Sequence, residues 1–201
     1  DHRDLHKEYR RQRQMCIRDS FPEDALQDFK GDWVGNTLRI LGIDPGTIST
    51  GIGVVDSISG ELSTPYHSVI KTRKNQTIEQ RLKTIYDSKE RIILKMDPDE
   101  VAIEEPFVSE NPRTAIAIGQ AQATALIIAT KHEKAVTRYA AREIKKSVTN
   151  NGGSSKHQVK SMVEILLGNI EIQGPDDISD ALAVAICHHN SKMIQGLTFN
   201  E

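Results

Sequence analysis

The stretch "RILGIDPGTISTGIGVVD" (39–56) constrains the fold of this chain more than any other. Its first apolar run, Ile40 to Ile43, ends abruptly in Asp44, and Pro45 and Gly46 follow directly. A second run rich in Gly, Ile and Val comes a few residues later. Short apolar runs separated by Pro and Gly predict two buried strands joined by a tight turn. A carboxylate at the end of such a strand is costly unless a charged group compensates it, so Asp44 is a candidate functional residue.

The rest of the chain alternates between short apolar runs typical of strands and apolar residues at helical spacing. Three strands in succession, followed by alternating strands and helices, predict an α/β layered fold with a mixed five-stranded sheet. The expected strands are 38–44, 51–57, 61–71, 101–108 and 135–140, and the expected helices are 77–96, 111–132, 141–149, 156–168 and 176–193. Asn111 is the expected N-cap of the second helix, because Pro112 suits the first helical position.

The pattern divides the 201 residues into three parts. Residues 1–37 have no clear period and are expected to be an N-terminal extension, disordered or not native to the protein. Residues 38–193 are expected to form one α/β domain of ordinary size, and 194–201 a C-terminal tail. Two cysteines, Cys16 and Cys187, are too few for a disulfide framework and favour a reducing compartment, so we expect a cytoplasmic protein. No apolar run approaches the roughly 20 residues that a bilayer requires.

Acidic residues stand at the ends of three predicted elements. Asp44 ends the first strand, Glu104 and Glu105 end the fourth, and Asp177 and Asp180 begin the last helix on one face. Each has a simple structural alternative, since Asp44 could form a turn and acids at a helix start favour its dipole. Together, carboxylates without a His or Cys cluster favour Mg²⁺ or Mn²⁺. Such a cluster can position two cations for attack of water on a phosphodiester.

Basic residues are concentrated in one part of a chain whose net charge is −2. Between Lys131 and Lys160, eight Lys or Arg residues stand against two Glu residues. A solvated helical face would explain this stretch, and so would a surface that contacts phosphates.

Two further features suggest binding surfaces. The helix 111–132 carries Ala115, Gly119 and Ala123 four residues apart, which would let another helix approach closely, although this stripe could also pack on its own sheet. Phe107 follows the acids of the fourth strand, in a loop with polar neighbours. It is either a core residue at the strand end or an aromatic exposed at the mouth of the proposed site.

Four segments resemble the bacterial RuvC-type Holliday-junction resolvases, in the same order and at similar spacing. They are "GIDPGTISTGIGVVD", "AIEEPFVSENPRTAIAIGQAQA", "YAAREIKKSVTNNGGSSKHQV" and "DDISDALAVAICH", and the resemblance covers residues 38 to 192. It implies a ribonuclease-H-like fold, a homodimer, and Mg²⁺-dependent nicking of two opposed strands of a four-way junction in recombination and repair. It also implies the RuvA–RuvB branch-migration complex as a partner.

The resemblance assigns roles to individual residues. It implies that Asp44, Glu104, Asp177 and Asp180 are the metal ligands, with Asp44 bridging two ions, and that Glu105 is not a ligand. Lys145 and Lys156 match the lysines near the scissile phosphate, and Phe107 matches an aromatic that stacks on a base at the crossover. Pro106 departs from the small apolar residue common in the family. We further expect Arg113, Lys146 and Lys160 to contact DNA.

Three other functions remain open at this point. Actin-like sugar kinases and ATPases share an opening like "GIDPGT", but those chains are usually far longer. A direct measurement of nucleotide binding would distinguish such a protein from a nuclease. A related nuclease could act on other DNA or RNA, although the Asp177–Asp180 pair and the loop lysines favour a junction enzyme. A module that binds branched DNA without cutting it would not need four intact carboxylates.

Overall fold

The computed structural model describes residues 37–105 and 112–198, which belong to one compact unit. These residues form the following elements in chain order: β1 (Thr37–Asp44), β2 (Ser49–Ile58), β3 (Glu61–Lys71), α2 (Ile78–Met96), β4 (Glu100–Glu104), α3 (Pro112–Lys131), β5 (Ala135–Tyr139), α4 (Ala141–Thr149), α5 (Lys156–Leu166) and α6 (Asp176–Thr198). Across the ranges just given, no helix is both long enough and apolar enough to cross a bilayer.

The strands form one mixed sheet in the order β3-β2-β1-β4-β5. β1, β2 and β3 pair antiparallel as a meander, whereas β4 pairs parallel with β1 and β5 pairs parallel with β4. Ile43 lies opposite Ile103 in this parallel pair. Each strand ends at the next residue, so β1 and β4 end at the same edge of the sheet. The predicted five-stranded mixed sheet is confirmed, and it brings Asp44 and Glu104 to a common edge.

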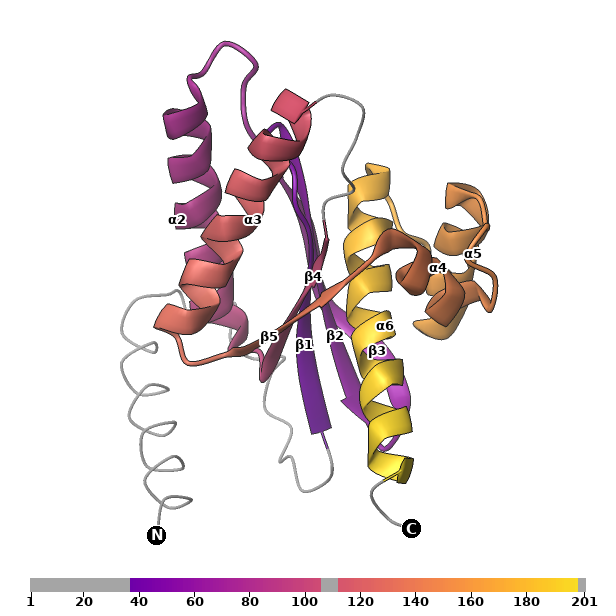
Figure 1. Ribbon diagram of the computed structural model, residues 1–201. Helices are drawn as coiled ribbons and strands as arrows, with labels where there is room; N and C mark the ends of the chain where they lie inside the picture. The colour runs from indigo at the N-terminus through magenta and orange to yellow at the C-terminus, as the bar shows by residue number, and fades with distance from the viewer. Residues whose placement is uncertain (1–36, 106–111, 199–201) are drawn as a thin grey trace, which may run out of the picture. The chain divides into compact units, whose positions relative to one another are not determined.

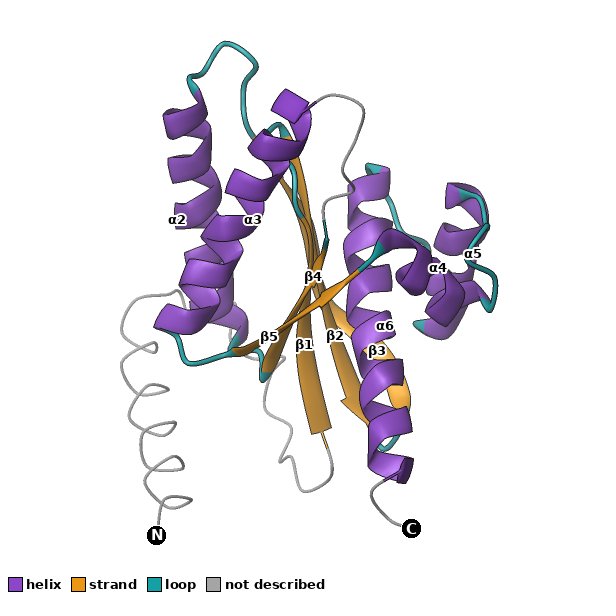
Figure 2. Ribbon diagram, viewed as in Figure 1, coloured by secondary structure: helices purple, strands orange, loops and turns teal. Residues whose placement is uncertain are grey.

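Helices cover both faces of this sheet (Figures 1 and 2). α2 and α3 pack together on one face, over a core that includes Leu41 and Ile43 of β1. α6 crosses the other face, over Ile40, and α4 and α5 pack on α6. Because side chains alternate along a strand, successive residues of β1 pack into the two cores in turn, and β1 is buried on both faces.

Local sequence signals explain most of the boundaries. α2 begins after Thr77, which forms a capping box with Gln80, and ends at Asp97 in the left-handed conformation. Ser155 caps α5 in the same way. β4 ends at Glu104, and α6 continues past residue 193 to Thr198. The expected N-cap Asn111, like Pro106 and Phe107, lies outside the described residues.

Two glycines let α6 lie unusually close to the sheet. A Cβ on Gly42 of β1 would overlap the carbonyl oxygen of Ala181, and a Cβ on Gly51 of β2 would overlap that of Asp177. Gly51 stands directly opposite Asp44 in the β1–β2 ladder. The first turn of α6 therefore rests on the backbone beside Asp44, and a side chain at Gly51 would push the two acids apart.

A buried polar network holds the middle of α6 in place. The ring of His188 is hydrogen-bonded to the hydroxyl of Tyr139 at 2.8 Å and to Glu100 Oε2 at 2.9 Å, and Lys192 pairs with Glu100 at 2.8 Å. This network links α6 to the end of β5 and the start of β4. Tyr139 and His188 are buried and hydrogen-bonded, so their burial is tolerated and they fix the position of the helix along the sheet.

Gly42→Ala is predicted to destabilise the protein because backbone atoms of α6 occupy the space that its Cβ would take. Overpacking of this kind costs about 2–3 kcal/mol, which lowers the melting temperature by about 4–12 °C at this chain length. Gly153→Ala is the matched control, because the nearest atom, Asn151 Oδ1, lies 3.4 Å from the added Cβ. Equal melting temperatures for the two variants would contradict the close approach of α6.

Candidate active site

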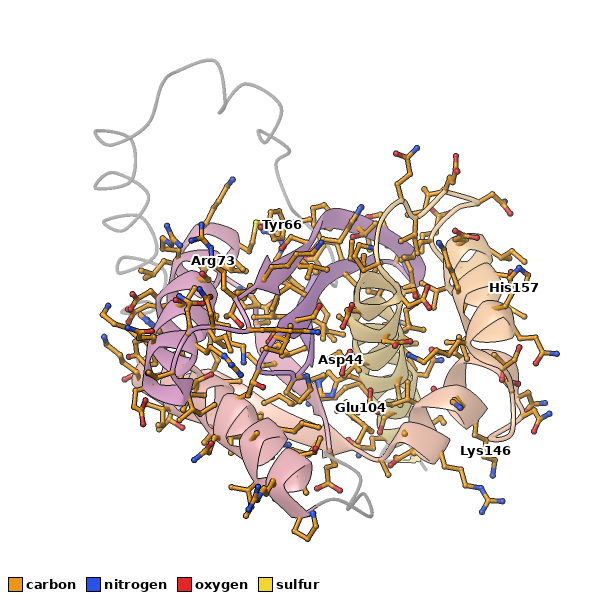
Figure 3. All side chains as sticks on the ribbon, turned by 90° about the horizontal axis from the view of Figure 1, so that it is seen from above. Asp44, Tyr66, Arg73, Glu104, Lys146 and His157 are labelled. Atoms are coloured by element: carbon orange, nitrogen blue, oxygen red, sulfur yellow. The ribbon has the colours of Figure 1, made fainter. Side chains whose placement is uncertain are left out.

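Four carboxylates from three elements gather at one edge of the sheet. Asp44 ends β1 and Glu104 ends β4, while Asp177 and Asp180 lie in the first turns of α6. Figure 3 shows Asp44 and Glu104 close together at the middle of this edge, beside the start of α6. The structure thus brings together the four acids that the sequence indicated as metal ligands.

The turn after Asp44 is tied down by hydroxyl groups. Thr50 Oγ1 donates to the carbonyl of Gly46 at 2.5 Å, and Thr72 Oγ1 donates to the carbonyl of Thr47 at 2.5 Å. The amide of Thr72 also donates to the carbonyl of Ile48 at 2.9 Å. Bonds to both β2 and the end of β3 therefore fix the turn, and with it the backbone that carries Asp44.

The electrostatics of the cluster favour a bound cation. Burial, together with the negative charges of Glu104, Asp180 and Asp177, raises the pKa of Asp44 to about 7. Burial and the charge of Asp180 raise the pKa of Glu104, and burial also raises that of Asp180. Carboxylates that disfavour one another's ionisation in this way are stabilised by a positive ion placed between them.

Lysines supply part of that positive charge. Lys156 Nζ, at the start of α5, donates to Asp180 Oδ2 at 3.1 Å. The charge of Lys156 lowers the pKa values of Asp44, Glu104 and Asp180, and that of Lys145 lowers the pKa of Glu104. Lys145 and Lys156 therefore lie at the acidic edge, as the sequence predicted, although the lysines do not cancel the raised pKa of Asp44.

The donor set fits a hard divalent cation. All four donors are carboxylates, and oxygen ligands are those that Mg²⁺ and Mn²⁺ prefer. Within residues 37–105 and 112–198, no three His, Cys, Asp or Glu side chains converge closely enough to hold an ion as they stand. The fit therefore rests on the donor chemistry and on the uncompensated negative charge of the cluster.

The two adjacent glutamates of β4 have different surroundings. Glu104 interacts with the acid cluster, whereas the half-exposed side chain of Glu105 lies 3.7 Å from Arg138. The amide of Glu105 donates to the carbonyl of Tyr139 at 2.8 Å, which fixes the end of β4 against β5. The geometry supports Glu104, and not Glu105, as the member of the site.

Sequence reasoning missed two supporting residues. Gln122 of α3 is buried, and its Nε2 donates to the carbonyl of Glu104 at 3.3 Å, so α3 helps to position the end of β4. Lys89 of α2 is fully buried and donates to the carbonyl of Ala121 at 3.0 Å. Burial lowers the pKa of Lys89 to about 7, against the opposing effect of Asp44.

The predicted basic stretch divides into two parts. Lys131 pairs with Glu90 at 2.6 Å and Lys134 pairs with Asp97 at 2.7 Å. Both pairs lie near the beginnings of β4 and β5, away from the carboxylate cluster at the strand ends. These two lysines are paired with acids outside the carboxylate cluster, which favours the solvated helical surface over a phosphate-contacting surface for this part of the stretch. The remaining basic side chains lie on β5, α4 and α5 (Figure 3 labels Lys146 at α4).

The structure describes three of the other predicted DNA contacts. Lys146 is exposed on α4 and Lys160 is half-buried on α5. Arg113 is exposed in the first turn of α3. Phe107 lies outside the described residues.

A ribonuclease-H-like sheet with carboxylates at the ends of β1 and β4 and at the start of α6 defines a metal-dependent nuclease. The family described as "Crossover junction endodeoxyribonuclease RuvC" matches residues 40–188. The chain belongs to this family, whose members are nucleases that hydrolyse DNA.

Individual relatives support the assignment. The crossover junction endodeoxyribonuclease RuvC of Dehalococcoides mccartyi is 45% identical over 161 residues, covering 80% of this chain and 98% of the relative. The solved RuvC of Thermus thermophilus is 27% identical, with a TM-score of 0.73 over 79% of this chain and 97% of that one. The T. thermophilus RuvC in complex with a Holliday junction is 26% identical, with a TM-score of 0.71 over 78% of this chain and 96% of that one.

Asp44→Asn is predicted to stabilise the metal-free protein at pH 8. The pKa of Asp44 is about 7 in the folded protein, above the 3.8 of an unperturbed aspartate, so stability is lost as the pH rises between these values. The amide removes this loss, which amounts to at most about 4 kcal/mol. Urea unfolding in a chelator should give equal stabilities for variant and wild type near pH 4 and a more stable variant at pH 8. A difference independent of pH would contradict the assigned pKa.

Proposed function

We propose that the chain is a Mg²⁺-dependent endonuclease that resolves Holliday junctions by paired symmetric nicks, in recombination and repair in the cytoplasm. The observation that carries this proposal is the meeting of Asp44, Glu104, Asp177 and Asp180 at one sheet edge. Membership of the RuvC family supports the junction as substrate.

The residues of this chain would hold the cation and the scissile phosphate. Asp44 and Glu104 stand on strand ends, so their backbones need little rearrangement when a ligand binds. Asp177 and Asp180 complete the ligand set, and two Mg²⁺ ions, or Mn²⁺ in their place, supply Lewis acidity and a more acidic water when bound. Lys156 and Lys145 would stabilise negative charge that develops on the phosphate. Because Asp44 holds a proton below about pH 7, metal binding should strengthen as the pH rises through 7.

The decisive experiment is a nicking assay on a synthetic four-way junction with Mg²⁺. Asp44→Asn removes a ligand charge with almost no change in shape, so cleavage should fall at least about 100-fold. Junction binding, measured by fluorescence anisotropy in a chelator, should persist or strengthen because a negative charge near phosphate is removed.

Three results would contradict the proposal. One is near wild-type nicking by Asp44→Asn, which would show that the carboxylate is not a ligand. Another is equal cleavage of a linear duplex or an RNA of matched length, which would favour the related nuclease with another substrate. The third is a wild-type protein that binds the junction without cutting it, which would favour a binding module.

We also propose a homodimer, because symmetric nicks require two sites. The outer face of α3 supports it, since Ile116 and Ile127 are 62% and 59% exposed. Gly119, between Ala115 and Ala123, has no atom within 4 Å of an added Cβ, so this part of the stripe does not pack on its own sheet. An exposed apolar stripe with a small residue at its centre suits close packing of a second helix.

Ile127→Glu is predicted to convert the dimer to a monomer, because it places a charge in the apolar contact between two copies of α3. Sedimentation at micromolar concentration measures the change. Ile165→Glu is the control, since Ile165 is 55% exposed on α5 and away from this stripe. A wild-type protein that sediments only as a monomer would overturn the dimer.

The remaining contacts are proposals that rest on the same function. Phe107 would stack on an unpaired base at the opened crossover, and Arg113, Lys146 and Lys160 would contact the DNA backbone. The RuvA–RuvB branch-migration complex would be the protein partner. The roles of Phe107 and of the protein partner come from the sequence resemblance. The basic residues are supported by their charge and accessibility, since Arg113 and Lys146 are exposed and Lys160 is half-buried.

A further inference from the structure

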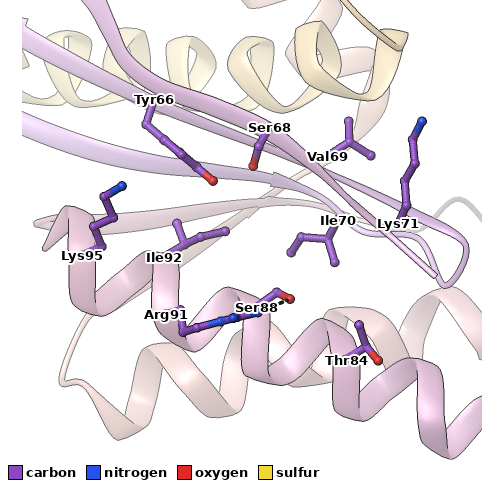
Figure 4. Close-up of a pocket in the computed structure, with 10 residues that line it drawn as sticks. All are labelled: Tyr66, Ser68, Val69, Ile70, Lys71, Thr84, Ser88, Arg91, Ile92 and Lys95. Atoms are coloured by element: carbon purple, nitrogen blue, oxygen red, sulfur yellow. Dashed lines mark hydrogen bonds between the residues drawn. The ribbon is translucent and has the colours of Figure 1, made fainter. Parts of the chain in front are cut away.

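A groove of about 390 Å³ lies between the edge strand β3 and helix α2 (Figure 4). Tyr66, Ser68 and Ile70 point from β3 toward α2, and Arg91 and Lys95 rise from α2 on the other side. Hydroxyl groups of Thr84 and Ser88 complete its polar lining. No carboxylate lines this groove, so its lining is cationic and rich in hydrogen-bond donors.

The charges of α2 are sorted between its two sides. The side toward β3 carries Arg81, Thr84, Ser88, Arg91 and Lys95, spaced three and four residues apart and therefore on one helical face. The three acids of α2 do not line the groove: Asp87 pairs with Lys83 at 2.6 Å, Glu90 pairs with Lys131 at 2.6 Å, and Glu79 stands in the first turn of the helix. A solvated helical surface usually mixes both signs, whereas this face has only positive charge.

The positive charges of Arg91 and Lys95 are not neutralised by a carboxylate of the described residues. Arg91 Nη2 lies 3.3 Å from the hydroxyl of Ser88, and Lys95 Nζ lies 5.9 Å from the ring centre of Tyr66. Among the described residues, neither Arg91 nor Lys95 forms an ion pair with a carboxylate. Both side chains are exposed, so an anion can reach them without displacing an existing partner.

The groove begins at the catalytic edge of the sheet. Lys71, at one end of it, stands opposite Ser49, just after the turn that follows Asp44. The other end is at Tyr66, five residues back along β3, a distance of about 16 Å. Arg81 donates to the carbonyl of Lys74 at 2.7 Å and so holds the loop between β3 and α2 at the same edge. A strand of DNA leaving the acidic cluster on this side would meet the groove.

We infer that the groove between β3 and α2 binds the phosphodiester backbone of a junction arm, through Arg91 and Lys95. The inference rests on the proposed junction substrate and adds a second contact surface, on the opposite side of the acids from α4 and α5. The hydroxyls offer further donors to phosphate oxygens, and Ile70 and Ile92 offer apolar surface to the sugars. α3 packs on α2 and β5 and contributes no side chain to the lining of the groove.

The test compares the salt dependence of junction binding in a chelator, where no cleavage occurs. The variants are Arg91→Gln, Lys95→Gln and the double variant, and the probe is a labelled four-way junction made with long or short arms. Lys83→Gln is the matched control, since it removes one charge from the same helix on the side away from the groove. Melting temperatures confirm that every variant is folded.

Each lost phosphate contact should reduce the slope of log affinity against log salt by about 0.9, hence by up to about 1.8 in the double variant. Lys83→Gln should leave the slope unchanged, and shortening the arms should remove the difference between wild type and variants. Equal slopes for Arg91→Gln/Lys95→Gln and Lys83→Gln would overturn the inference. Nicking by the wild type is measured in a separate assay. If the protein does not nick junctions, the comparison of binding slopes still tests whether the groove binds DNA.

Discussion

The active edge of this protein depends on the close approach of α6 to the sheet. Gly42 and Gly51 leave no side chain between the strands and the helix, and the backbone of Asp177 rests on Gly51. Gly51 is the ladder partner of Asp44, so one contact sets the separation of two carboxylates from distant parts of the chain. The parallel pairing of β1 with β4 then adds Glu104, because both strands end at the same edge.

That geometry creates an electrostatic problem which the rest of the molecule only partly relieves. Burial and mutual repulsion raise the pKa of Asp44 to about 7, so the metal-free site retains protons that ordinary carboxylates would lose. Lys156 offsets some of the negative charge by pairing with Asp180. The site is therefore least favourable when it is empty and ionised, which explains in physical terms why this arrangement suits a cation.

The sequence predicted the acids better than the structure that supports them. Asp44 and Glu104 were recognisable because each interrupts an apolar strand at its end, and that pattern is local. The packing role of Gly42 depends on Ala181, far along the chain, so no local pattern reveals it. Lys89 stands between polar neighbours and resembles a surface residue until α3 covers it. Lys131 and Lys134 belong to the basic stretch of the sequence, but in the fold they pair with Glu90 and Asp97 near the starts of β4 and β5. These partners lie far from them in the sequence, so the pairing is not predictable from it.

The central claim is that these four carboxylates form one cation site, and paramagnetic Mn²⁺ tests it most directly. Substoichiometric Mn²⁺ added to isotopically labelled, metal-free protein broadens the amide resonances of residues near the ion. The account predicts selective broadening at Asp44, Glu104 and Asp177–Asp180, weaker at pH 6 than at pH 8 because Asp44 is protonated below about pH 7. Broadening confined to other acidic positions, such as Asp87 and Glu90, or no selective broadening at either pH, would contradict it.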